Sequence, residues 1–154
     1  VGRMKCDGEE SSRRRGICLV VVSRASLSRM VCLDIWVDGQ RMGSLRSDGI
    51  ILCTPVGSSG YSVSAGGPLL YPAMDAIGFT PVCPFLNTIS PMDFPDRADI
   101  ELQILRSSTG LHLTVDGQEG HKLRQEDLVL ISGGLDSLRD MGGRHMLSRT
   151  LRPD

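Results

Sequence analysis

Short hydrophobic runs separated by turn residues make up most of the chain from Gly16 onward. The runs are about four to eight residues long and rich in Val, Ile and Leu, which is typical of strands rather than helices. Glycine, proline, aspartate and asparagine stand between them, as expected at turns. The pattern predicts a mostly β domain of about eight to ten strands with little helix. Strands are expected at 17–22, 31–37, 40–45, 50–53, 100–105, 111–115, 121–123 and 128–131, and from 76 to the prolines at 81 and 84.

The sequence Val-Asp-Gly-Gln occurs twice, at 37–40 and at 115–118. An Asp-Gly pair between two strand-like runs is a strong signal for a two-residue hairpin, because both central positions favour positive φ. Each copy is therefore predicted to turn the chain back on itself. The flanking sequences differ, so we interpret the copies as two similar turns and not as an internal repeat. A further turn is expected at 46–49.

Length and charge indicate one globular domain without a general affinity for nucleic acid or membranes. The chain has 154 residues, enough for a single core. Its formal net charge is -1, so no overall field attracts polyanions. The apolar runs are much shorter than the roughly 18 residues that suggest a membrane-spanning helix. We expect a polar, frayed segment at 1–15, the folded domain at 16–132 and a Gly/Arg-rich tail at 133–154.

The cysteines favour a reduced, cytoplasmic protein without a structural metal. There are five of them, an odd number at wide spacings, and three lie inside apolar runs, where cysteine behaves as a small hydrophobic residue. A zinc site needs paired ligands a few residues apart. No Cys-x-x-Cys or His-x-x-x-His spacing occurs, so no metal ligands are predicted.

One motif carries candidate chemistry: the apolar strand expected at 50–53 leads directly into Thr-Pro-Val-Gly-Ser-Ser-Gly-Tyr at 54–61. Ser58 is a plausible helix N-cap, and Gly66-Gly67-Pro68 is a plausible stop, so the pattern predicts a helix of barely two turns. Unpaired N–H groups at its start and three serine hydroxyls would suit phosphate or sugar hydroxyls. On the residues alone, a simple Gly/Ser connection explains the same pattern.

Several motifs in one register make the chain similar to the carboxy-terminal domain of the NAD kinases. That family has Asp-Gly, a short apolar run, Thr-Pro-Thr-Gly-Ser-Thr-Ala-Tyr and then Ala-Gly-Gly-Pro. The similarity extends from about Val20 to about Ile131. It implies an antiparallel-rich, β-sandwich-like domain with one or two short helices. The matching segments are Asp48 to Tyr61, Ser64 to Pro68, Pro72, Thr80 to Pro84 and Val115 to Gln118.

The resemblance implies that the parent protein is an enzyme of NADP biosynthesis. Such a kinase transfers a phosphoryl group from ATP or polyphosphate, with a divalent cation such as Mg, to the adenosine ribose 2′-hydroxyl of NAD. Homodimers or homotetramers are expected by the same resemblance. The implied lining of the NAD pocket comprises Thr54, Ser58, Ser59, Gly60 and Tyr61, with Ser64 supporting the wall.

Arg46 and Asp48 would lie at the nicotinamide end, reaching the site of a neighbouring subunit. On its residue type alone, Asp48 is better explained as a turn carboxylate capping Gly49. Likewise, Tyr61 alone is equally a core aromatic with a satisfied hydroxyl.

The chain also departs from the family pattern. NAD kinases supply a phosphate cradle and a catalytic carboxylate from a Gly-Gly-Asp-Gly loop in an amino-terminal domain, and these 154 residues contain no such loop. Gly-Gly-Leu-Asp at 133–136 resembles the Gly-Gly-Asp-Gly loop only superficially. An Asn-acid pair of the family is replaced by Cys18 and Leu19, and Val56 and Gly60 replace Thr and Ala.

No catalytic residue is therefore assigned, and we expect the chain alone to be inactive as a kinase. One alternative is a truncated or degenerate fragment that binds a nucleotide, or only a partner chain, without catalysis. Another is a related lipid kinase, against which Tyr61 and the Ala-Gly-Gly-Pro run argue.

Overall fold

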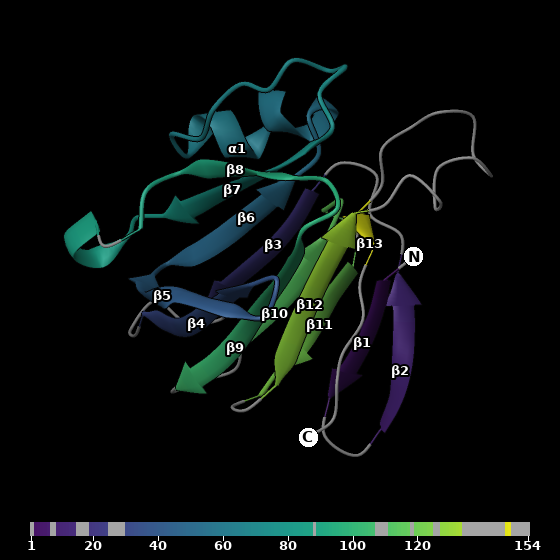
Figure 1. Cartoon of the computed structure of the whole chain (residues 1–154). Helices are drawn as coiled ribbons and strands as arrows, with labels where there is room; N and C mark the ends of the chain where they lie inside the picture. The colour runs from purple at the N-terminus through teal and green to yellow at the C-terminus, as the bar shows by residue number, and fades with distance from the viewer. Residues whose placement is uncertain are drawn as a thin grey trace.

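Two β-sheets lie face to face, and a short helical segment covers part of the outer side of one of them, as the computed structural model shows (Figure 1). The described residues are 2–6, 9–14, 19–24, 30–87, 89–106, 111–117, 119–124, 127–133 and 147–148. Among these residues no helix is long and apolar enough to cross a membrane.

Sheet I has the strand order β2-β1-β12-β9-β4-β5, with β13 paired to β12. Every described strand pair in it is antiparallel. Its strands are β1 (Gly2–Cys6), β2 (Glu9–Arg14), β4 (Val31–Val37), β5 (Gln40–Ser47), β9 (Asp99–Arg106), β12 (Leu128–Gly133) and β13 (Leu147–Ser148).

Sheet II has the order β11-β10-β3-β6-β7-β8 and is also antiparallel throughout its described pairs. Its strands are β3 (Leu19–Arg24), β6 (Gly49–Cys53), β7 (Ala76–Val82), β8 (Met92–Pro95), β10 (Leu111–Val115) and β11 (Glu119–Leu123). The mostly β, antiparallel fold expected from the sequence is thus confirmed.

The core fills the space between the two sheets, because alternate side chains of each strand point to the same face. In β4, Val31, Leu33 and Ile35 are fully buried and alternate with partly exposed residues. In β7, Ile77 and Phe79 belong to the same cluster. The intervening residues of β6 and β7 therefore face outward, beneath the helical segment.

Both hairpins predicted at Val-Asp-Gly-Gln are confirmed: the first has the two-residue loop 38–39, since Val37 pairs with Gln40, whereas in the second residues 116–118 lie between the paired Val115 and Glu119. One joins β4 to β5 in sheet I and the other joins β10 to β11 in sheet II. The φ angles are +50° and +76° at Asp38 and Gly39, and +50° and +71° at Asp116 and Gly117. Both central residues thus have the positive φ that this turn requires.

The aspartate of each hairpin also holds the start of the neighbouring strand. An oxygen of the Asp38 carboxylate accepts the N–H of Asp99 at 2.9 Å, and the Asp116 carboxylate accepts the N–H of Leu19 at 2.8 Å. Backbone bonds return from Asp38 to the Asp99 carbonyl and from Asp116 to the Leu19 carbonyl. Similar turn chemistry therefore stabilises both sheets.

The chain passes from sheet I to sheet II at Asp48, which is a single bend rather than the four-residue turn expected at 46–49. Strand β5 continues through Ser47, whose buried hydroxyl donates to the carbonyl of Gly49 at 2.8 Å. A Cβ at Gly49 would lie 2.5 Å from the carbonyl oxygen of Val22. Glycine is required here because β3 passes so close.

Several elements were not expected from the sequence. Strand β8 has only four residues, two of them polar or proline, and β1 and β2 lie in the polar segment 1–15. Strand β7 (Ala76–Val82), in contrast, agrees with the strand expected from 76 to the prolines, and Pro81 lies beyond Phe79, the last residue of β7 that pairs with β8. Most of the predicted tail lies at 134–146 and 149–154, outside the described residues.

Candidate functional site

The candidate site is an excursion between β6 and β7, residues 54–74, which we call the cap segment. It contains the 3-10 helix η1 (Val56–Ser59) and the helix α1 (Tyr61–Ser64). Figure 1 shows it above the ends of β6, β7 and β8. Six of the eight site residues predicted from the sequence lie in it, from Thr54 to Ser64.

The local structure differs from the predicted helix of two turns. Ser58 is inside η1 and is not a helix N-cap, because Gly60 interrupts the helical path with a φ of -91° and a ψ of -124°. The N–H of Gly57 donates to the Thr54 hydroxyl at 3.2 Å, and the N–H of Gly60 donates to the Gly57 carbonyl at 3.2 Å. These two amides are therefore used within the segment, contrary to the expected row of free N–H groups.

The predicted stop at Gly66 and Gly67 is confirmed, and its geometry is that of a Schellman motif. Gly66 has a φ of +87° and donates to the carbonyl of Val63 at 3.0 Å. Gly67 donates to the carbonyl of Ser62 at 2.9 Å. This pair of bonds satisfies carbonyls at the end of the helix that would otherwise lack partners.

Small polar side chains form the inner side of the cap segment. Ser58 has no exposed surface; its hydroxyl donates to the carbonyl of Pro55 at 2.6 Å and accepts the N–H of Leu70 at 3.0 Å. Thr54 is 2% exposed. Thus Ser58 joins distant parts of the segment, and the side chains of Ser58 and Thr54 are both covered.

The same inner side rests on sheet II through Ser62 and Thr80. Both side chains have no exposed surface, and their hydroxyl oxygens are 2.9 Å apart. Cys53 lies beside them, and burial raises the pKa of its thiol, although hydrogen bonding with Ser62 works in the opposite direction. A Cβ at Gly78 would lie 2.7 Å from the Cys53 sulfur, so glycine allows this close approach.

The outer side of the cap segment carries the other four predicted residues. Tyr61 is 50% exposed, which rules out the alternative of a core aromatic. Ser59, Gly60 and Ser64 are also exposed. Ser59 and Ser64 donate weakly inward, to the carbonyls of Val56 at 3.2 Å and of Gly60 at 3.4 Å. This side therefore presents one aromatic ring and two hydroxyls to solvent.

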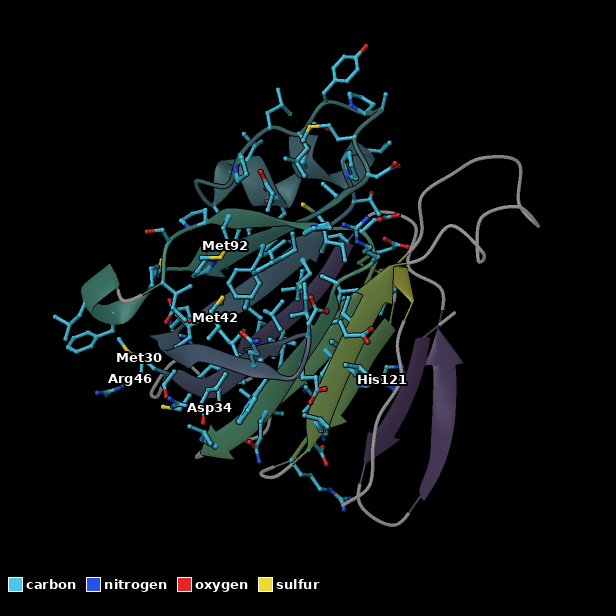
Figure 2. The ribbon with its side chains drawn as sticks, viewed as in Figure 1. Met30, Asp34, Met42, Arg46, Met92 and His121 are labelled. Carbon is cyan, nitrogen blue, oxygen red and sulfur yellow. The ribbon has the colours of Figure 1, made fainter. Side chains whose placement is uncertain are left out.

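Arg46 and Asp48 are not brought to the cap segment. They lie at the opposite end of β6 from Thr54, and at roughly 3.3 Å per strand residue the separation from Asp48 to Thr54 is about 20 Å. The Asp48 carboxylate pairs with Arg24 at 3.0 Å instead of capping Gly49. The Arg46 guanidinium lies 5.1 Å from the ring centre of Phe85, in the short 3-10 helix η2 (Phe85–Asn87), and Figure 2 places Arg46 on the opposite side of the molecule from η1 and α1.

The described residues hold no competing metal site, since no three His, Cys, Asp or Glu side chains gather among them. On sheet I, Arg41 bonds the Asp34 carboxylate at 2.8 Å and lowers its pKa, which is an exposed ion pair. His121 has a buried Nε2 without a hydrogen-bond partner in the described part of the chain. Its register opposite Leu113 turns it toward the core, away from the cap segment.

Sequence reasoning missed three residues that organise the site: Arg24, Ser62 and Thr80. Thr80 lies in a different strand, 18 residues from Ser62, so no local motif links them. Alternation along β7 offered one signal, because Thr80 does not share the face on which Ile77 and Phe79 enter the core. The structure shows that Thr80 is nevertheless buried. A buried hydroxyl normally has a partner, which would have directed attention to the cap segment.

Comparisons with known proteins all point to one family. A family model described as the ATP-NAD kinase C-terminal domain matches residues 19–139. An NAD kinase of Nitratidesulfovibrio vulgaris (strain DP4) is 45% identical over 119 residues, covering 77% of this chain and 40% of that protein. An NAD kinase of Clostridium beijerinckii is 38% identical over 120 residues, covering 78% and 42%. The chain thus spans about two fifths of the length of these relatives.

Two solved structures share the fold. A yeast NADH kinase complexed with NADH superposes with a TM-score of 0.81 at 26% identity, over 97% of this chain and 42% of that one. An NAD kinase from Archaeoglobus fulgidus in complex with ATP gives a TM-score of 0.66 at 24% identity, over 83% and 49%.

Proposed function

The chain belongs to the NAD kinase family, in which it corresponds to the carboxy-terminal domain, and we propose that it binds NAD through the outer side of its cap segment. In the parent protein this domain would present the adenosine ribose 2′-hydroxyl for phosphorylation to NADP. The observation that carries the proposal is the half-exposed Tyr61 ring beside two exposed serines, on a segment anchored from below.

The two sides of the cap segment divide the predicted NAD-binding residues. Tyr61 would stack on the adenine or ribose, with Ser59 and Ser64 offering hydroxyls beside it. Gly60 has no side chain and would let a ligand approach the backbone. Thr54 and Ser58 would act from beneath by holding this surface in shape, since both are buried.

Arg46 and Asp48 would serve the nicotinamide end of a dinucleotide held by a neighbouring copy of the chain. Their position about 20 Å from Thr54, estimated from strand length, supports this assignment to another subunit's site. The ion pair with Arg24 would hold the Asp48 carboxylate in a fixed orientation. A homodimer or homotetramer is the assembly that this arrangement requires.

Phosphoryl transfer itself would need residues beyond these 154. The phosphate cradle and the carboxylate that accepts the hydroxyl proton would come from a Gly-Gly-Asp-Gly loop, which this sequence lacks. ATP or polyphosphate would be the donor, and a divalent cation such as Mg²⁺ would be held on its phosphates. The described residues offer no cluster of ligands for that cation.

The free thiols of Cys32, Cys53 and Cys83 favour a cytoplasmic location.

The binding proposal is tested by calorimetric titration of the full chain with NAD, comparing Tyr61→Ala with Tyr71→Ala. The chain has two tyrosines, both in the cap segment, and Tyr71 is the matched control because it is 72% exposed. Stacking of a base on an aromatic ring contributes about 1–3 kcal/mol, so Tyr61→Ala should weaken binding by about fivefold or more. Tyr71→Ala should change it little.

Lack of binding by the wild-type chain at millimolar NAD would overturn the proposal and favour a fragment that serves only as a partner surface. A coupled assay tests the second part. The chain supplied with NAD, Mg²⁺ and either ATP or polyphosphate should form no NADP. Formation of NADP by the chain alone would show that it carries its own phosphate cradle.

A further inference from the structure

Helix α1 is attached to the rest of the domain at a single buried side chain. It has only four residues, and Ser62 is the one among them that is buried. A helix this short has no independent stability in water, so its position is set by its tertiary contacts. Ser62 meets Thr80 on β7, where the two hydroxyl oxygens are 2.9 Å apart, and the Cys53 thiol on β6.

The Ser62 and Thr80 side chains have little room to move. A Cβ at Gly67 would lie 2.2 Å from the Thr80 hydroxyl and 2.5 Å from the Ser62 hydroxyl, so the chain already fills this space. The carbonyl of Ser62 accepts the N–H of Gly67, and its side chain interacts with the Cys53 thiol. Ser62 is therefore fixed through both its backbone and its side chain.

Thr80 stands on a rigid support. Strand β7 is paired with β6 through Val82 and with β8 through Phe79, so Thr80 lies opposite Ile51 of β6, one residue beyond the pairing with β8. Valine has nearly the same shape and would fill the space with apolar contact. A hydroxyl pair adds a directional bond that apolar packing lacks, so it can fix how α1 is turned as well as where it lies.

We propose that Thr80 is a positioning residue for dinucleotide binding: through Ser62 it sets the orientation of α1 and so of the neighbouring Tyr61 ring. Thr80 has no exposed surface and touches no ligand. Its effect on binding passes through Tyr61. This inference rests on the proposed function, and it adds a residue outside the cap segment to the site.

The test compares Thr80→Val, which removes the hydroxyl, with Thr80→Ser, which keeps it, in the full chain. The net worth of one hydrogen bond predicts that Thr80→Val weakens NAD binding by about three- to tenfold, measured by calorimetry. Thr80→Ser should stay within about twofold of wild type on the same reasoning. The binding loss from Thr80→Val should disappear in a Tyr61→Ala background, whereas a general structural defect would persist there.

A second readout follows the tyrosines directly. With 3-fluorotyrosine incorporated, the chain has two fluorine signals, assigned with Tyr71→Phe. Thr80→Val should shift or broaden the Tyr61 signal and leave that of Tyr71 unchanged. Hydrogen exchange of the Gly67 amide, which bonds to Ser62, should accelerate at the same time. If Thr80→Val does not fold, Ser62→Ala replaces it, since it breaks the same bond from the other side.

The outcomes separate the two proposals. Unchanged NAD affinity in Thr80→Val, or an equal loss in the Tyr61→Ala background, overturns the positioning role. If wild type does not bind NAD, the proposed function fails. The fluorine and exchange measurements then still decide whether Thr80 orients α1: an unperturbed Tyr61 signal and unchanged exchange at Gly67 would overturn that as well.

Discussion

The cap segment contains four serines within seven residues, and its two sides use them in opposite ways. Ser58 and Ser62, four residues apart, are fully buried and bonded to the carbonyl of Pro55 and to Thr80. Ser59 and Ser64 are exposed and make only weak local bonds. Residue type therefore does not separate the scaffold from the proposed ligand surface. The difference lies in which side faces sheet II.

The comparison implies that substitutions on the inner side should act on stability first, and those on the outer side on binding alone. Buried hydroxyls lose a partner and a packed environment when they are removed. Exposed hydroxyls return to water without such a cost. Pairs of neighbouring residues, one from each side, make this difference measurable.

The largest effect is expected for Gly67→Ala, because the added methyl group would lie 2.2 Å from the Thr80 hydroxyl and 2.9 Å from the Ser62 carbonyl. Forcing a methyl group into packed space typically costs about 2–3 kcal/mol. Gly66→Ala is the control: it has nothing within 4 Å, and only its φ of +87° is unfavourable. That strain costs about 1–2 kcal/mol.

Urea unfolding measures both variants. Only Gly67→Ala should also weaken NAD binding, because it displaces the inner side from sheet II. Equal destabilisation by the two alanines would show that backbone strain, and not contact with Thr80, governs this turn.

A smaller effect on stability is expected for Ser58→Ala. The change leaves the buried N–H of Leu70 without its 3.0 Å acceptor, which should cost about 1–3 kcal/mol. Ser59→Ala, the adjacent residue on the outer side, should stay within about 0.5 kcal/mol of wild type. Urea unfolding again provides the measurement, and a destabilised Ser59→Ala would contradict the division into two sides.

Much of the fold was predictable because it depends on local patterns. The strands at 100–105 and 111–115 alternate in hydrophobicity, and each hairpin is signalled by its own Asp-Gly pair. Strand β8 was missed because its four residues contain Asp93 and Pro95 and gain their order from pairing with β7. Such pairing is not visible in the strand's own sequence.

The site was predictable as a segment but not in its internal arrangement. Thr54 to Ser64 could be recognised as a unit. The helical path is interrupted at Gly60, however, and Ser58 lies on the buried side instead of at a helix start. The partner of Ser62 is Thr80, which a single sequence does not identify because the bond depends on how β6 and β7 pair. On residue type the Asp48 carboxylate was expected to cap Gly49, but it pairs with Arg24 from another strand.

The rates at which Cys53 and Cys83 react with a thiol reagent measure how well the cap segment covers sheet II. Cys53 is fully buried under the cap segment and its pKa is raised, chiefly by burial, so its thiol stays protonated at neutral pH. Cys83 is exposed just after β7. With a thiol reagent at neutral pH, peptide mapping should show Cys83 labelled at least about a hundredfold faster, since the thiolate is the reactive form.

Labelling of Cys53 should rise with pH and should accelerate in Gly67→Ala, which loosens the cover above it. The exposed-side variant Ser59→Ala should leave the Cys53 rate unchanged. If Cys53 reacts as fast as Cys83 in the wild-type chain, the cap segment does not shield sheet II in solution.

The smallest effect concerns Asp93 on β8, which pairs with Gly78 and so lies on the same outward face as Cys53. Partial burial raises the pKa of the Asp93 carboxyl above its ordinary value of 3.8. The folded state therefore holds this proton more tightly than the unfolded state, and stability falls as pH rises from about 3.8 through the raised pKa. Asp93→Asn removes this dependence, so urea unfolding between about pH 4 and 7 should show wild type losing slightly more stability than the variant.

The Asp93 charge also contributes to raising the pKa of Cys53, after burial. Asp93→Asn should thus make Cys53 modestly more reactive at a given pH, without the acceleration that cap opening produces. Opening of the cap segment and removal of the Asp93 charge should change the Cys53 labelling rate by very different amounts. The two causes, physical cover and electrostatic influence, can therefore be distinguished. Parallel pH profiles for wild type and Asp93→Asn, together with equal labelling rates, would place Asp93 outside the environment of the inner side.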